Sequence, residues 1–136
     1  MTTVFEEGMG KVIRDSLEAV DTIVFAYLFG SRAAGRARPS SDIDVAVFLR
    51  DGVDLIDEKL NIIGCLTQHL QTDAVDVVIL NTAPTSLVGR IMAMREVVID
   101  RDPYRRHSFE SLALRQYMDF SVKETTILDN RFKLGR

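Results

Sequence analysis

Helix-spaced apolar residues alternate along this chain with short, continuous apolar runs. The short runs, rich in β-branched and aromatic residues, predict strands at 22–29, 42–49, 73–80 and 97–99. Apolar residues recurring every three or four positions predict helices at about 5–20, 56–70, 84–95 and 108–128. The pattern therefore predicts an α/β (α+β) fold in which helices flank a small sheet. We expect a single domain, with its core at about 5–100 and a long C-terminal helix after it.

Between the first two predicted strands, a glycine–serine pair precedes two carboxylates. Gly30 and Ser31 end one apolar run, and Asp42 and Asp44 begin the next after a gap of ten residues. Because side chains alternate along a strand, the two carboxylates point to the same side. They repel each other unless a cation lies between them, and Mg²⁺ commonly bridges carboxylates to substrate phosphates. The pattern predicts a site for metal-assisted phosphoryl chemistry, in which two ions stabilise the attacking and leaving oxygens.

The same connection carries candidate phosphate contacts. Gly30 permits close approach of the backbone, and Ser31 can cap a short helix whose first N–H groups favour an anion. Arg32, Arg36 and Arg38 follow and could neutralise phosphate charge, although simple solvation is the alternative for each.

A third acidic residue interrupts the apolar run at 73–80. An ionised carboxylate inside a buried strand is costly unless it is paired or binds a metal. We therefore expect Asp76 to be a third metal ligand and a candidate base for the proton of the acceptor. Asp73, at the start of the same run, is better interpreted as a turn or capping residue.

These residues resemble the motifs of minimal nucleotidyltransferases of the DNA polymerase β-like superfamily. More narrowly, the chain is similar to the MNT-domain antitoxins of HEPN/MNT toxin–antitoxin pairs. The family pattern G-S-x10-D-x-D coincides with Gly30, Ser31, Asp42 and Asp44, and the third family carboxylate falls on Asp76. The motifs cover residues 29–80.

The resemblance implies a mixed sheet and a defined reaction. It implies transfer of AMP from ATP, with two Mg²⁺ ions, to a tyrosine hydroxyl of a cognate HEPN ribonuclease toxin, and an oligomer with that toxin. Asp42, Asp44 and Asp76 would hold the metal. Ser41 also stands where such sequences often carry serine, and with Gly30, Ser31, Arg32 and Arg36 it completes the expected nucleotide-binding set.

Two other functions stay open. Small-molecule nucleotidyltransferases, such as those that modify aminoglycosides, share the motif, but they generally carry an additional helical domain. Alternatively, an antitoxin could act by binding and masking its toxin alone. An apolar stripe on the last predicted helix either covers the sheet or receives a partner; it comprises Phe109, Leu112, Leu114, Tyr117, Met118, Phe120 and Val122, with Ala113.

Composition is typical of a small cytoplasmic enzyme. The 136 residues are 46% hydrophobic and 27% charged, enough for one core. We expect no signal peptide and no membrane span. A net charge of −3 disfavours direct nucleic-acid binding. Cys65, the only cysteine, is expected to be a buried structural thiol.

Arg101 and His107 match the R-x4-6-H ribonuclease motif of HEPN toxins. That motif belongs to an all-helical fold, and here Pro103 lies inside it, so we interpret the match as chance. The surrounding basic cluster, with Arg105 and Arg106, is expected to be a solvated face.

Overall fold

The computed structural model describes residues 8–30 and 42–134, with side chains described up to residue 119. Four strands form one open sheet in the order β3-β2-β1-β4. The strands are β1 (Ile23–Phe29), β2 (Ile43–Leu49), β3 (Val75–Ile79) and β4 (Glu96–Asp100). The helices of the described residues are α1 (Met9–Leu17), α2 (Leu55–Leu70), α3 (Thr85–Ala93) and α4 (Pro103–Leu134). β1 is antiparallel to β2 and β4, whereas β2 and β3 are parallel, which confirms a mixed sheet flanked by helices.

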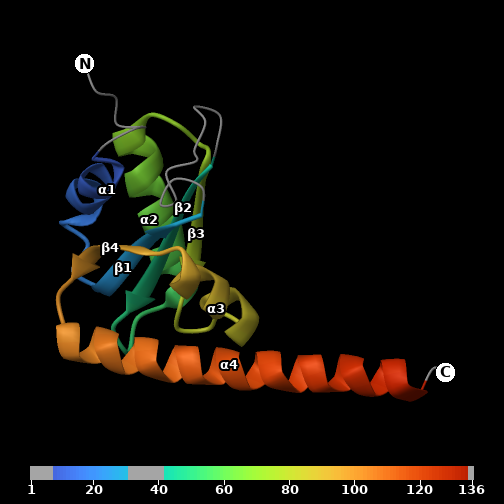
Figure 1. Ribbon diagram of the computed structural model, residues 1–136. Coiled ribbons are helices and arrows are strands. Elements are labelled where there is room, and N and C mark those ends of the chain that lie inside the picture. The colour runs from blue at the N-terminus through green and yellow to red at the C-terminus, as the bar shows by residue number, and fades with distance from the viewer. Residues whose placement is uncertain (1–7, 31–41, 135–136) are drawn as a thin grey trace.

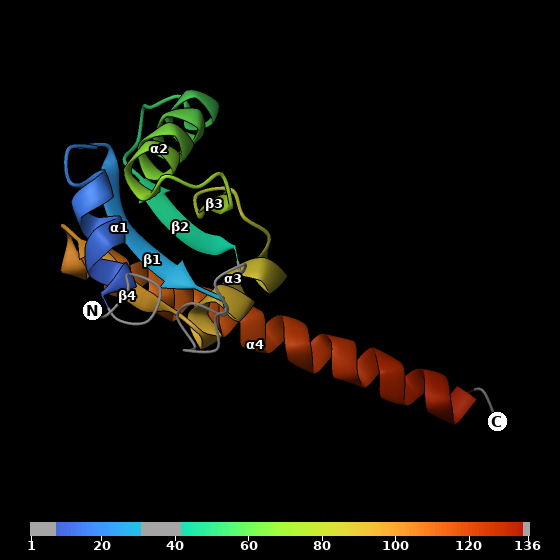
Figure 2. The ribbon, with the colours of Figure 1, turned by 90° about the horizontal axis from the view of Figure 1, so that it is seen from above.

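Helices cover both faces of this sheet (Figures 1 and 2). On one face, α1 and α2 pack against the strands. The buried residues there include Ile13 and Leu17 of α1, Ile62 and Leu66 of α2, and Val45, Val47 and Val77 of the strands. On the other face, α3 and α4 pack on Phe25, Tyr27 and Ala46 through Val88, Ile91, Met92 and Ala113. Because β1 and β2 are covered on both sides, they are continuous apolar runs, whereas β3 and β4 form the two edges.

The connection from β2 to β3 runs through α2, as parallel neighbours require a crossover. Asp54 caps this helix, since its Oδ1 accepts hydrogen bonds of 3.0 Å from the N–H groups of Ile56 and Asp57. The helix is followed by Gln71 in the left-handed conformation, with a φ of 56°. Cys65, expected to be buried, is partly buried and packs against the core.

The helix α4 begins earlier than the sequence pattern predicted. The expected start at Ser108 is wrong, because Asp102 and Pro103 initiate the helix and do not merely break the preceding pattern. Proline suits the first helical position, where no N–H partner is needed, and Asp102 Oδ1 accepts a 3.1 Å hydrogen bond from the N–H of Arg105. The helix then runs well past the sheet (Figures 1 and 2). In the described part of the chain, no helix is long and apolar enough to cross a membrane.

A buried polar cluster holds α4 on the sheet. Glu110 is only 6% exposed, and its carboxylate accepts a 2.8 Å hydrogen bond from the hydroxyl of Tyr27. The same carboxylate forms ion pairs with Arg95 at 2.9 Å and Arg106 at 3.1 Å, and Arg106 also pairs with Asp100 at 3.0 Å. Burial alone would raise the pKa of Glu110, but these donors hold it below its usual range. The cluster therefore fixes the first turns of α4.

Candidate active site

Two of the three candidate carboxylates are direct neighbours in the sheet. In the parallel ladder of β2 and β3, Asp44 lies opposite Asp76. Alternation places both side chains on the face that carries Ala46 and Val78, which is the face covered by α3 and α4. Asp42 precedes the first residue of β2 and, two positions from Asp44, shares its side of the chain.

The charges of these carboxylates act on one another. Burial raises the pKa of the Asp44 carboxyl above its ordinary value, and the negative charges of Asp76 and then Asp42 raise it further. Asp44 is half-buried, whereas Asp42 and Asp76 are exposed. The negative charges that Asp44 meets from Asp76 and Asp42 mark a region that attracts cations.

A glycine closes the site on the side of β1. Phe29, the last residue of β1, pairs with Asp44, so Gly30 comes directly beside that carboxylate. Gly30 has a φ of 78°, which residues with a Cβ rarely adopt. A Cβ at this position would also collide with Asp44 Oδ2. The carboxylate therefore occupies space that only glycine leaves free.

Asp76 lies in a different environment from the one the sequence suggested. We expected it inside a buried strand, but β3 is an edge strand and Asp76 is exposed near its start. The register nevertheless brings Asp76 beside Asp44, while Asp73 lies in the bend before the ladder begins. The reasoning from burial was wrong, and the assignment of Asp76 to the site now depends on the register.

The donor set is compatible with Mg²⁺. Carboxylate oxygens are the ligands this ion prefers, and it usually completes its coordination with water and substrate phosphates. Within residues 8–30 and 42–134, no three His, Cys, Asp or Glu side chains converge closely enough to hold a metal unaided. An ion held by Asp42, Asp44 and Asp76 would therefore need further ligands, such as water or substrate phosphate.

Ser31, Arg32, Arg36 and Ser41 lie outside the described residues. Gly30 is the one member of that set whose position the structure gives.

The basic cluster near the start of α4 is more structural than expected. Arg101 donates hydrogen bonds to the carbonyl groups of Glu18 at 2.8 Å and Ile23 at 3.0 Å, and also to that of Val20. Arg105 lies over the ring of Phe48, with 5.1 Å between its guanidinium carbon and the ring centroid. Arg101 is exposed, as expected for a solvated face, although its guanidinium also binds carbonyl groups around the end of α1. The prediction was wrong for Arg106, whose side chain is 14% exposed and forms ion pairs with Asp100 and Glu110.

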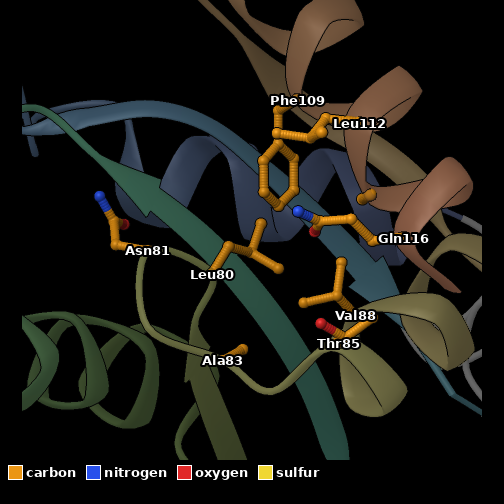
Figure 3. A pocket seen from close by; sticks show the side chains of 9 residues that line it. Leu80, Asn81, Ala83, Thr85, Val88, Phe109, Leu112 and Gln116 are labelled. Carbon is orange, nitrogen blue, oxygen red and sulfur yellow. The ribbon is translucent and has the colours of Figure 1, made fainter. Parts of the chain in front are cut away.

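Two cavities lie at different distances from the carboxylates. A cavity of about 370 Å³ is lined by Asp76 together with residues of α2 and the start of α3. A second cavity of about 180 Å³ lies between α3 and α4, where Phe109 faces Leu80 and Val88 (Figure 3). Asn81 lines the second cavity and is hydrogen-bonded to the backbone of Leu49, the last residue of β2. The second cavity is thus at the opposite end of β2 from Asp44.

The chain matches a known protein family over most of its length. A family model described as "Polymerase beta, Nucleotidyltransferase" matches residues 11–104. No curated protein matches the chain.

Several solved structures resemble the fold over nearly its full length. A crystal structure described as a toxin–antitoxin with AMP-PNP is 25% identical, with a TM-score of 0.73 over 90% of this chain and 98% of that chain. A structure of a tri-AMPylated Shewanella oneidensis HEPN toxin in complex with MNT antitoxin contains a chain that matches at 24% identity and a TM-score of 0.64, over 97% of this chain and 99% of that chain. A crystal structure of the toxin–antitoxin MntA–HepT matches at 24% identity and a TM-score of 0.63, over 96% and 99%.

Proposed function

Since this chain belongs to the polymerase β nucleotidyltransferase family, as its motifs implied, we propose that it is an antitoxin that transfers AMP from ATP to a tyrosine hydroxyl of a HEPN-domain toxin. The observation that carries the proposal is the register that brings Asp76 opposite Asp44, beside a glycine that leaves room for the carboxylate. The acceptor is inferred from similar structures, one holding AMP-PNP and another an AMPylated HEPN toxin.

In this proposal each carboxylate has a role set by its position. Asp42 and Asp44 would hold both Mg²⁺ ions, and Asp76 would complete the site at the acceptor side. When bound, Mg²⁺ neutralises charge on the phosphates and on the attacking and leaving oxygens. Gly30 and Ser31 would contact the β- and γ-phosphates through the backbone, with Arg32, Arg36 and Ser41 as further nucleotide contacts.

The transfer is an in-line displacement. The acceptor oxygen bonds to the α-phosphorus of ATP while the bond from that phosphorus to the oxygen bridging to the β-phosphate breaks. Pyrophosphate leaves with the bonding electrons, and the hydroxyl proton passes to the Asp76 carboxylate and then to water. No oxidant or further reactant is required.

A matched pair of variants tests the placement of the third carboxylate. Asp76→Asn removes a negative charge beside Asp44 and should lower transfer of α-labelled ATP to a purified HEPN-domain protein from the same genome by at least about 100-fold. Asp73→Asn, an equal change outside the ladder, should have little effect. The opposite ranking of the two variants would overturn the assignment.

Masking without modification is the second candidate, because α4 exposes apolar side chains at Leu112, Leu114 and Met118. The double variant Asp42→Ala/Asp44→Ala separates the two functions. If modification neutralises the toxin, this variant should bind its partner and leave it unmodified and toxic. Equal protection of cells by the double variant and the wild type, at equal expression, would favour masking.

A further inference from the structure

The helix α3 crosses the face of the sheet that carries the carboxylates. It follows β3 and precedes β4, and these two strands are the opposite edges of the sheet. Its buried residues pack in one cluster with Tyr27 of β1 and Ala46 of β2, so the helix passes over the two central strands. Moving along α3 from its first residue therefore means moving away from β3 and Asp76.

The two sides of α3 have different neighbours. On one side lies α4 (Figure 1), because a Cβ on Gly89 would collide with the ring of Tyr117, and Val88 lines the cavity between the two helices. Leu87 instead lines the cavity that Asp76 borders. The side of α3 that carries Leu87 is thus turned towards the candidate active site.

Arg90 is the one charged residue of α3, and it lies on this second side. Residues three positions apart are neighbours on a helix surface, so Arg90 adjoins Leu87. Its side chain is exposed, and it forms no ion pair with an acidic residue of the part of the chain that the structure describes. Because it comes after Leu87, it lies farther from β3 and nearer to the central strands, where Asp44 and Gly30 are located.

The proposed reaction requires a cation in this position. A triphosphate adds negative charge to that of the carboxylates, and the charge on the leaving pyrophosphate grows as its bond to the α-phosphorus breaks. In an in-line displacement the acceptor and the leaving group lie on opposite sides of the α-phosphorus. If the acceptor enters at Asp76, pyrophosphate leaves on the side of Gly30. A guanidinium suits phosphate oxygens because it can donate two parallel hydrogen bonds to them.

We propose that Arg90 binds the β- and γ-phosphates of ATP and stabilises the charge of the leaving pyrophosphate. This proposal rests on the proposed function and adds a nucleotide contact from α3, outside the glycine–serine connection. The oxygen that bridges to the β-phosphate keeps the electrons of the broken bond, and Arg90 donates hydrogen bonds to the phosphate oxygens as their charge increases. The guanidinium stays protonated throughout and transfers no proton.

Nucleotide binding measures this contact without the acceptor. In the presence of Mg²⁺, Arg90→Ala should weaken the binding of AMP-PNP and of pyrophosphate by about tenfold or more, the loss expected for a hydrogen bond to a charged group. The binding of AMP, which lacks the β- and γ-phosphates, should match the wild type. Arg90→Lys should give an intermediate loss, because it keeps the charge and loses the planar fork. Unchanged affinities for AMP-PNP and pyrophosphate in Arg90→Ala would overturn the proposal, as would an equal loss of AMP affinity, which would place the side chain at the nucleoside or the α-phosphate.

Arg14→Ala is the matched control. Arg14 is also an exposed arginine in the last turn of a nine-residue helix, but α1 packs on the opposite face of the sheet. Both variants lose the same favourable interaction with a helix dipole and should melt alike, so only Arg90→Ala should lose affinity for AMP-PNP. An equal loss in both variants would overturn the proposal. A wild type that binds AMP-PNP and pyrophosphate but modifies no HEPN-domain protein would instead refute the proposed function.

Discussion

The close approach of Gly30 to Asp44 predicts that a substitution at Gly30 affects the transfer rate more than it affects stability. Replacing Gly30 with alanine puts a Cβ into a left-handed conformation, which costs roughly 1–2 kcal/mol. The new atom also collides with Asp44 Oδ2, so the carboxylate must leave its rotamer at a further cost of roughly 0.5–1.5 kcal/mol. We therefore expect Gly30→Ala to lower the free energy of unfolding by about 1.5–3.5 kcal/mol.

The catalytic effect should exceed the effect on stability. A displacement of about 1 Å in a metal-binding carboxylate is expected to cost about 100-fold in rate. Gly52 provides the control, because its φ of 84° carries the same backbone cost and a Cβ there meets nothing within 4 Å. Gly52→Ala should lose only the backbone part of the stability and keep its transfer rate.

Two assays on the same preparations measure these effects: denaturant unfolding for stability, and transfer of α-labelled ATP to the HEPN-domain protein for rate. Both are run at a temperature where each variant is folded. If Gly30→Ala transfers within a few-fold of Gly52→Ala, the space beside Asp44 has no bearing on catalysis and the reasoning fails.

Three further predictions concern stability. Burial and neighbouring carboxylates raise the pKa of Asp44 above its ordinary value of 3.8 in the folded protein. Without metal, the stability that Asp44 contributes is therefore fully present below pH 3.8 and is lost as the pH rises through the folded-state pKa. Asp44→Asn should flatten this loss of stability with pH and should melt at a higher temperature than the wild type at neutral pH. Glu110→Ala should lower the free energy of unfolding by roughly 3–5 kcal/mol, because it leaves Arg95, Arg106 and the hydroxyl of Tyr27 without their shared partner. A loss below about 1 kcal/mol in denaturant unfolding would contradict this reasoning. Gly89→Ala should destabilise the packing of α3 on α4, since its Cβ would collide with the ring of Tyr117. Gly64→Ala, whose Cβ would meet nothing within 4 Å, should stabilise α2 by about 0.5–1 kcal/mol. Thermal melting that ranks these two variants the other way would refute the packing argument.

The sheet and the spacing of the carboxylates could be predicted because both depend on local alternation. A continuous apolar run before Gly30 and another after Asp42 indicate two central strands, and side-chain parity alone places Asp42 and Asp44 on one side. The helices followed from their apolar spacing in the same way. The helix boundaries were predicted less well. α4 begins at Pro103 and not at Ser108, because proline both ends one pattern and begins another, and it runs on to Leu134. α1 ends at Leu17, three residues before its expected end.

The remaining features depend on contacts between residues far apart in the sequence. Nothing in the apolar run around Asp76 shows that β3 is an edge strand, so the exposure of the Asp76 side chain could not be predicted from the sequence. Arg101 binds carbonyl groups from residues 18–23, and Glu110 meets Tyr27 across the interface of α4 and the sheet. Such long-range partners are set by packing and leave no periodic signal in the chain.

Intact mass spectrometry of the acceptor tests the central claim most directly. The HEPN-domain protein is incubated with ATP, Mg²⁺ and either the wild-type chain or the Asp42→Ala/Asp44→Ala variant. We predict that the wild type adds about 329 Da per AMP to the acceptor and that the double variant adds nothing while still binding it. An acceptor whose mass is unchanged by the wild type, or changed equally by the double variant, would contradict the account.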